Sequence, residues 1–168
     1  RIIRRPPDPI VSNPVSWVER KEITMSKNRV PAIEGWLTMD EDNPQLLGYL
    51  DESSGTYFFP KDVSISHAPG HVDAELKGGA LSNRGKLRSY TTNHYKPPAP
   101  YVAPDPFEPY TVAAVELNDE RMVVLGQLAD GVDPANIEVG MEMQLGLGKL
   151  YEDEENEYMV WKWRPVPA

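Results

Sequence analysis

A chain of 168 residues has room for one compact domain with additional segments, and its 40% of hydrophobic residues is enough for a core. The net charge of −9 disfavours a nucleic-acid surface, because phosphate binding needs clustered lysines and arginines. Without cysteine there is no disulfide, thiolate nucleophile or thiolate metal ligand, and without a run of about 18 apolar residues we expect a soluble protein of the cytoplasm.

The first 30 residues predict a tether. The prolines of RIIRRPPDPI forbid helix and favour an extended chain. Asn13-Pro14 suits an N-cap followed by the first helical position, so a short helix is expected over residues 15–23. Met25 is equally compatible with a native start, in which case residues 1–24 belong to a fusion or an upstream domain.

Residues 31–84 have a weaker pattern. Asn43-Pro44 predicts the start of a helix or a turn, and residues 57–59 predict a short strand. His67 and His71 are spaced like two zinc ligands, but Pro-Gly between them disfavours a helix and no third ligand is evident. We therefore expect a loop without metal there.

The stretch from Gly85 to Leu128 is where we place the function. Residues 85–95 predict a long, half-buried strand. The KPPAPYVAPDPFEP segment that follows holds six prolines, so it cannot pair as a central strand, and loops of this length are usually functional. Its apolar anchors, Tyr101, Phe107 and Tyr110, either fold back on the domain or meet a partner.

The remaining elements complete an antiparallel pattern. Residues 110–117 and 122–128 predict a hairpin, and Asp133-Pro134 predicts a capped helical turn. Residues 139–147 and 158–164 predict two more strands, joined through a solvated acidic tip at 152–157. We expect core positions at Val139, Met141, Met143, Leu145 and Leu147. The order predicts a mainly β fold, a five-stranded Greek-key barrel of the OB type, with a β-sandwich as the alternative.

Catalytic motifs are absent from the sequence. It has no Gly-rich phosphate loop, no Gly-x-Ser-x-Gly elbow and no His-Glu-x-x-His. A non-catalytic binding domain is therefore favoured over an enzyme. Two alternatives stay open: a single-strand nucleic-acid-binding OB domain, which needs aromatic stacking and a basic groove, and a hydrolase that depends on His94.

The run LLGYLDESSGTYFFP resembles the start of the zinc-ribbon and OB-fold accessory proteins of thiolase-like acyl-CoA enzymes. LSNRGKLRSYTTNHY, PYVAPDPFEPYTVAAVEL, VVLGQLADGVDP, VGMEMQL and VWKWRP resemble the later features of that family, so the likeness covers residues 31–166. Where the family has Cys-x-x-Cys-Gly, this chain has Asp51 and Ser54 before Gly55, and the second cysteine pair falls within 64–70.

The resemblance implies three parts. Residues 1–30 form a tether with a short helix, and residues 31–84 form an N-terminal helix with a degenerate, metal-free, rubredoxin- or zinc-ribbon-like segment. Residues 85–168 form the OB barrel. Serine and aspartate in place of thiolates cannot hold a tetrahedral zinc, so packing must keep the ribbon-like segment folded.

The resemblance is greatest to the partners of steroid side-chain aldolases, and it implies a role in lipid metabolism and steroid degradation. We expect a non-catalytic accessory subunit in a hetero-oligomer with a thiolase-like enzyme of the lipid-transfer-protein type. It would help to close the partner's active site and acyl-CoA channel during aldol cleavage of a steroid side-chain CoA thioester. An accessory role in a thiolase or acyltransferase condensation complex is the alternative.

Several further expectations follow from the same resemblance. The chain alone should have no activity and bind no cofactor, the coenzyme A thioester being the substrate of the complex. A hydratase domain, fused or docked, would account for the tether, and neither nucleic acid nor membrane is an expected partner. No residue is given a catalytic or metal-binding role.

The expected contact residues are aromatic or basic. Partner and channel contacts are assigned to aromatic residues of the ribbon-like segment and the proline-rich loop: Tyr57, Phe58, Phe59, Tyr101, Phe107 and Tyr110. Contacts to the phosphates of coenzyme A are assigned to Arg88, His94 and Lys96.

Overall fold

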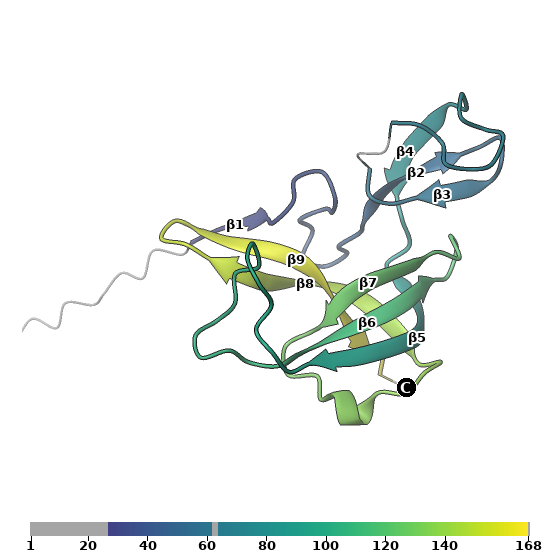
Figure 1. The fold of residues 1–168 in the computed structure, drawn as a ribbon. Coiled ribbons are helices and arrows are strands. Elements are labelled where there is room, and N and C mark those ends of the chain that lie inside the picture. The colour runs from purple at the N-terminus through teal and green to yellow at the C-terminus, as the bar shows by residue number, and fades with distance from the viewer. Residues whose placement is uncertain (1–26, 62–63, 168) are drawn as a thin grey trace, which may run out of the picture.

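The computed structural model describes residues 27–61 and 64–167, which form two β-sheets (Figure 1). The helix expected over residues 15–23 lies outside the described residues. The larger sheet contains β1 (Asn28–Pro31), β5 (Arg84–Asn93), β6 (Tyr110–Leu117), β7 (Val123–Leu128), β8 (Glu142–Glu152) and β9 (Asn156–Pro165). The smaller sheet contains β2 (Leu47–Asp51), β3 (Thr56–Phe58) and β4 (Leu76–Ala80).

The larger sheet closes into a five-stranded barrel. Its strand order is β1-β9-β7-β6-β5-β8, and an additional pairing of β8 with β9 completes the ring. β5 makes closure possible because its first residues, 84–86, pair with β8 on one side, while residues 85–93 pair with β6 on the other. Gly85 takes part in both pairings. The predicted mainly β fold with an OB-type barrel is confirmed.

The barrel core follows the alternation in the sequence. In β6 every second residue is buried, and Val115 and Leu117 are among the fully buried side chains. The core stripe expected in residues 139–147 is only partly correct. Met143 and Leu145 are fully buried, but Val139 and Met141 are exposed because β8 begins only at Glu142. The predicted helical turn is a 3-10 helix, η1 (Pro134–Asn136), capped by Asp133.

The segment before the barrel differs from the expectation in one respect. Residues 31–61 and 64–84 contain no helix. Of the two structures predicted at Asn43-Pro44, the turn is the one that forms. The Asp40 carboxylate accepts hydrogen bonds from the main-chain N–H groups of Asp42 and Asn43 at 2.9 and 3.1 Å, which stabilises a turn there. No helix among the described residues is long and apolar enough to cross a membrane.

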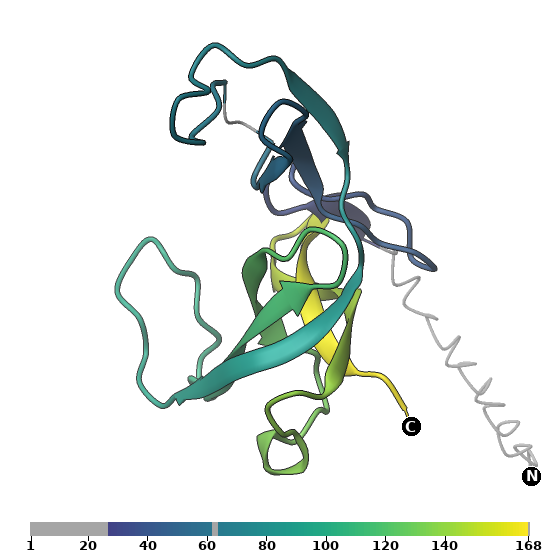
Figure 2. The same cartoon turned by 90° about the vertical axis from the view of Figure 1, so that its right-hand side faces the viewer.

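The small sheet stands at one end of the barrel, as Figures 1 and 2 show. Leu37, Leu46 and Leu81 precede the barrel strands in sequence, yet they belong to the same buried cluster as the barrel core. The contact also contains aromatic rings. Phe59 lies 5.6 Å, centroid to centroid, from both Trp36 and Trp161. The two sheets therefore share one hydrophobic core.

Candidate partner-binding surface

Asp51 lies where the resemblance expects the first metal-binding pair. Its side chain is fully buried, and its carboxylate accepts hydrogen bonds from the hydroxyl groups of Ser53, Ser54 and Ser66 at 2.5, 2.7 and 2.7 Å. The main-chain N–H groups of Ser53 and Ser54 donate to it as well. These hydrogen bonds, that of Ser53 above all, hold the pKa of Asp51 well below its usual range.

The two histidines of this segment do not converge. His71 Nδ1 is 2.7 Å from Ser53 Oγ, whereas the His67 ring lies 6.0 Å from the ring of Phe58. Among the described residues, no group of three His, Cys, Asp or Glu side chains is close enough to hold a metal ion. A buried carboxylate therefore joins the β2–β3 turn to the loop at Ser66.

The aromatic residues of the proline-rich loop pack against the barrel. Tyr101 stacks on Tyr110 at 5.7 Å, and Phe107 meets Tyr110 edge-on at 6.4 Å. Gln127 Nε2 on β7 donates to the Tyr101 hydroxyl at 3.3 Å. Of the two possibilities left open by the sequence, these three rings therefore fold back on the domain, although the loop itself extends beside the barrel (Figure 2).

The predicted contact residues of the ribbon-like segment lie elsewhere. Tyr57 and Phe59 pack against the common core, and Phe59 is in contact with Trp36 and Trp161. Phe58 points to the other side of β3, where it meets His67. The six predicted aromatic residues thus form one group on the loop and another around the small sheet.

The three basic residues expected at coenzyme A do not form one cluster. Arg88 donates two hydrogen bonds to the Glu116 carboxylate, from Nε at 3.0 Å and from Nη2 at 2.9 Å, which lowers the pKa of Glu116. His94 and Lys96 are exposed beyond the end of β5. At about 3.3 Å per residue, His94 lies roughly 20 Å along the strand from Arg88. No single phosphate group reaches all three.

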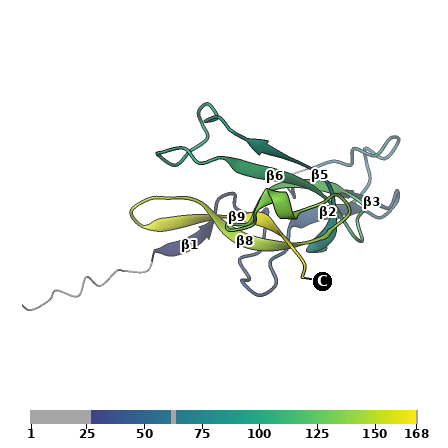
Figure 3. The same ribbon diagram turned by 90° about the horizontal axis from the view of Figure 1, so that it is seen from below.

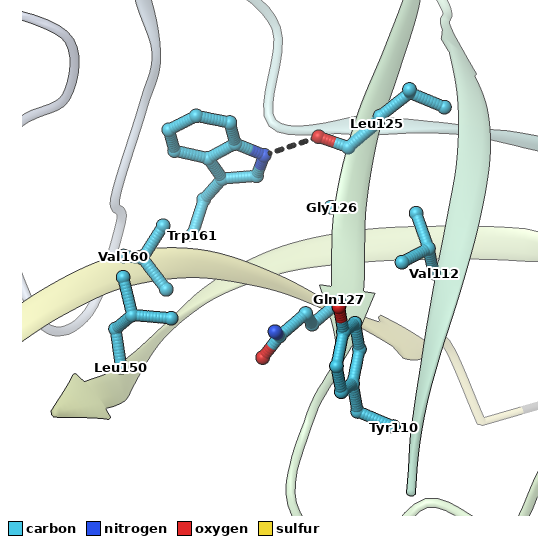
Figure 4. A pocket seen from close by; sticks show the side chains of 8 residues that line it. All are labelled: Tyr110, Val112, Leu125, Gly126, Gln127, Leu150, Val160 and Trp161. Atoms are coloured by element: carbon cyan, nitrogen blue, oxygen red, sulfur yellow. Dashed lines mark hydrogen bonds between the residues drawn. The ribbon is translucent and has the colours of Figure 1, made fainter. Parts of the chain in front are cut away.

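A groove lies where the barrel closes least completely. β7 and β9 are paired only at Gln127–Lys162 and Leu128–Trp163. Beside this short ladder is an opening of about 270 Å³ (Figure 4). We call it the seam groove; its lining residues are Tyr110, Val112, Leu125, Gly126, Gln127, Leu150, Val160 and Trp161.

Two local features shape the seam groove. The indole N–H of Trp161 donates to the main-chain carbonyl of Leu125 at 2.8 Å and links the strands beyond their ladder (Figure 4). Leu150 is the extra residue at an irregularity between Lys149 and Tyr151, where β8 shifts its register against β9. Such bulges redirect side chains, and Leu150 lines the groove.

The seam groove connects the two aromatic groups. Tyr110 lines the groove and packs against the two aromatic rings of the proline-rich loop. Trp161 also lines the groove and packs against Phe59 and Trp36. Of the residues predicted from sequence, only Tyr110 lines the groove itself. Trp161 and Leu125 fall within the strands predicted at 158–164 and 122–128, and the sequence gives neither residue a binding role. The structure exposes Val123 and Leu125 on either side of buried Val124, and the unbroken apolar run at 123–125 gives no sequence signal for this face.

These features define a class of protein: an OB-fold barrel with a small antiparallel sheet packed at one end and an apolar groove at its seam. Residues 79–147 match the family model of the C-terminal OB-fold domain of ChsH2.

A comparison with solved structures gives a similar result. This chain is similar to one described as "Ltp2-ChsH2(DUF35) aldolase", with a TM-score of 0.53 and 26% sequence identity over 72% of this chain and 84% of that chain. A search of curated proteins found no match. The predicted resemblance to an OB-fold accessory protein associated with an aldolase is confirmed.

Proposed function

We propose that this chain is a non-catalytic accessory subunit of an aldolase complex. It docks on a thiolase-like enzyme subunit in a hetero-oligomer and helps to close that subunit's active site and acyl-CoA channel. The observation that carries the proposal is the similarity to the Ltp2-ChsH2(DUF35) aldolase, which covers most of both chains. The match of residues 79–147 to the ChsH2 OB-fold domain supports it independently.

The chemistry of the described residues supports a role without catalysis. The histidine–serine hydrogen bond found in the described part of the chain joins His71 to Ser53, and that serine is itself bonded to Asp51. A serine nucleophile needs the opposite order, in which the acid orients the histidine. His94, which a hydrolase of this type would need, is exposed beyond β5.

The reaction we propose for the complex is a retro-aldol cleavage of a steroid side-chain CoA thioester. The bond between the α-carbon and the hydroxyl-bearing β-carbon breaks, the hydroxyl proton is lost as the carbonyl product forms, and a proton adds to the α-carbon of the shortened thioester. The partner supplies the acid and base. Excluding water from such a site favours the reaction, and a subunit that docks through an apolar face can do this without a nucleophile of its own.

The alternative of single-strand nucleic-acid binding has less support. The seam groove is lined by no lysine or arginine, and the chain carries a net charge of −9. Sequence-independent binding of single strands depends on a basic groove that follows the phosphates. Filter binding with a single-stranded oligonucleotide should therefore show no micromolar affinity at physiological salt.

Co-expression tests the proposal directly. The chain should elute in one complex with a co-expressed thiolase-like subunit from the same organism, and the complex should cleave a 3-hydroxyacyl-CoA steroid to a carbonyl product and a shorter CoA thioester. A condensing or thiolytic complex would instead consume free coenzyme A, so omitting coenzyme A separates the two reactions. Separate elution of the two proteins would contradict the accessory role.

A further inference from the structure

The seam groove has an apolar rim that is open to solvent. Leu125 is 61% exposed, and Val123, two residues earlier on the same face of β7, is 50% exposed. Val124, which lies between them in β7, is buried in the core. An apolar surface of this kind beside a concave site is typical of binding faces rather than of ordinary solvent-exposed surface.

The polar groups of the groove already have partners within the chain. The indole N–H of Trp161 is bonded to the Leu125 carbonyl, and the Gln127 amide is bonded to the Tyr101 hydroxyl. The remaining lining side chains include Val112, Leu150 and Val160, which are aliphatic. An occupant therefore gains by burying apolar surface and not by making specific polar contacts.

The size of the groove favours a protein side chain over a small molecule. Small-molecule sites usually enclose roughly 300–1,000 Å³ and bury most of the ligand. The seam groove has about 270 Å³ and an exposed rim, so a whole acyl-CoA would stay largely in solvent there. One aliphatic or aromatic anchor from a partner fits the observed shape better, as in the centres of protein interfaces.

The strands that line the groove lead to an acidic tip. The β8–β9 hairpin extends from Leu150 and Val160 past a stacked Tyr151–Tyr158 pair, whose rings lie 4.5 Å apart. Figure 3 shows this hairpin projecting beyond the barrel. Five acidic residues lie in its turn or at the adjoining strand ends: Glu152, Asp153, Glu154, Glu155 and Glu157.

Part of this charge has no counterpart nearby. Glu152 pairs with Lys27 and Lys149, and Asp153 accepts a hydrogen bond from Tyr158. In the described ranges of the chain, no cation lies within ion-pair distance of Glu154 or Glu155, and both are exposed. β8 continues from Leu150 to Glu152, and the turn with Glu154 and Glu155 follows it, so a complementary surface has its basic group displaced from the groove toward the tip of the hairpin.

We propose that the seam groove receives an apolar side chain of the partner subunit, and that Glu154 and Glu155 meet a lysine or arginine of the same subunit at the tip of the β8–β9 hairpin. The inference rests on the proposed function and specifies which face of the barrel docks. It assigns a role to Leu125, Leu150, Val160 and Trp161, which sequence reasoning did not connect with binding. The apolar contact supplies affinity, and the charges at the tip guide approach and orientation.

The test uses the full chain with the thiolase-like subunit that co-elutes with it. Leu125→Asp should weaken binding by about tenfold or more, because it places a charge in a desolvated contact. Val72→Asp is the matched control, since Val72 is similarly exposed, at 57%, but belongs to the small-sheet segment. Glu154→Lys with Glu155→Lys should slow association and reduce its salt dependence. Unchanged binding by Leu125→Asp would overturn the inference.

Cross-linking keeps the inference falsifiable if Leu125→Asp fails to fold. A photoreactive residue at position 125 should cross-link to the partner subunit, and one at position 72 should not. Cross-links from position 125 to a second copy of this chain, or to an added acyl-CoA, would overturn it in favour of those occupants. If the wild-type chain forms no complex at all, the proposed function itself is wrong. If it forms a complex whose affinity does not depend on position 125 and that gives no cross-link from it, only this inference is wrong.

Discussion

Asp51 connects two stretches of the chain through hydrogen bonds to its buried carboxylate. Burying an unpaired carboxylate is very unfavourable, but five hydrogen bonds from three serines compensate this one. The donors come from the turn after β2 and from Ser66, which is 15 residues further along. The carboxylate therefore ties together the two stretches in which the resemblance places metal ligands.

The lowered pKa of Asp51 makes a prediction about pH. Because the folded-state pKa of Asp51 lies below the ordinary value of 3.8, its charged form stabilises the fold fully above that value. This contribution decreases as the pH falls below 3.8 and is lost as the pH passes through the lower, folded-state pKa. Asp51→Asn should lower the unfolding temperature at pH 7 and flatten its dependence between about pH 5 and 2. Thermal unfolding followed by circular dichroism would measure both effects. An identical acid profile in wild type and variant would contradict this account.

Zinc content gives a second prediction at the same position. Since a serine–aspartate cluster offers no thiolates, the purified protein should contain no stoichiometric zinc, and a chelator should leave its unfolding temperature unchanged. Elemental analysis measures the first and thermal unfolding with EDTA the second. One equivalent of zinc per chain would show that the hydrogen-bonded cluster is not what holds this segment together.

At the scale of elements, β5 depends on Gly85, the position where it pairs with β6 on one side and with β8 on the other. A Cβ on Gly85 would overlap the main-chain carbonyl of Glu116, and backbone cannot move aside. Gly85→Ala should therefore destabilise the barrel by about 1–3 kcal/mol or more. Gly79→Ala in β4 is the control, because a Cβ there meets nothing within 4 Å. It should be neutral or stabilising by about 0.4–1 kcal/mol. Denaturant unfolding would measure both, and equal losses would contradict the steric explanation.

The strands of the barrel were predictable because burial on one face leaves a period of two in the sequence, which β6 shows clearly. β4 was not, since its LKGGA sequence carries two glycines and is mostly exposed. The start of β8 was placed too early, because the apolar alternation continues through Val139 and Met141, which the structure exposes. The alternation of apolar and polar residues shows which side chains could face the core, but the hydrogen bonds to a neighbouring strand determine where a strand begins.

The candidate site was less predictable than the strands. Tyr110 was found because it follows a proline-rich loop, but Leu125, Leu150 and Trp161 come from three other strands. They meet only because β7 and β9 pair over two residues and β8 shifts its register near Leu150. The register between strands that are distant in sequence depends on how the whole barrel closes, so it cannot be predicted from the residue pattern of one strand.

At the scale of the whole molecule, the small sheet and the seam groove are physically connected. Trp161 lines the groove and also packs against Phe59 and Trp36, which come from the segment before the barrel. The small sheet therefore supports one wall of the groove, although none of its own residues line it. This gives the segment a structural purpose without a metal.

Paired substitutions on neighbouring residues test this connection. Phe59→Ala removes a partly buried ring from the Trp36–Trp161 contact and should destabilise the fold by about 2–3 kcal/mol, below the 3–5 kcal/mol of a fully buried phenylalanine. It should also increase hydrogen exchange around Trp161 and weaken partner binding. Phe58→Ala is the matched control, because that ring meets His67 on the opposite side and should leave exchange in β9 unchanged. If both variants raise exchange in β9 equally, the small sheet supports the barrel in general and not the wall of the groove through Phe59.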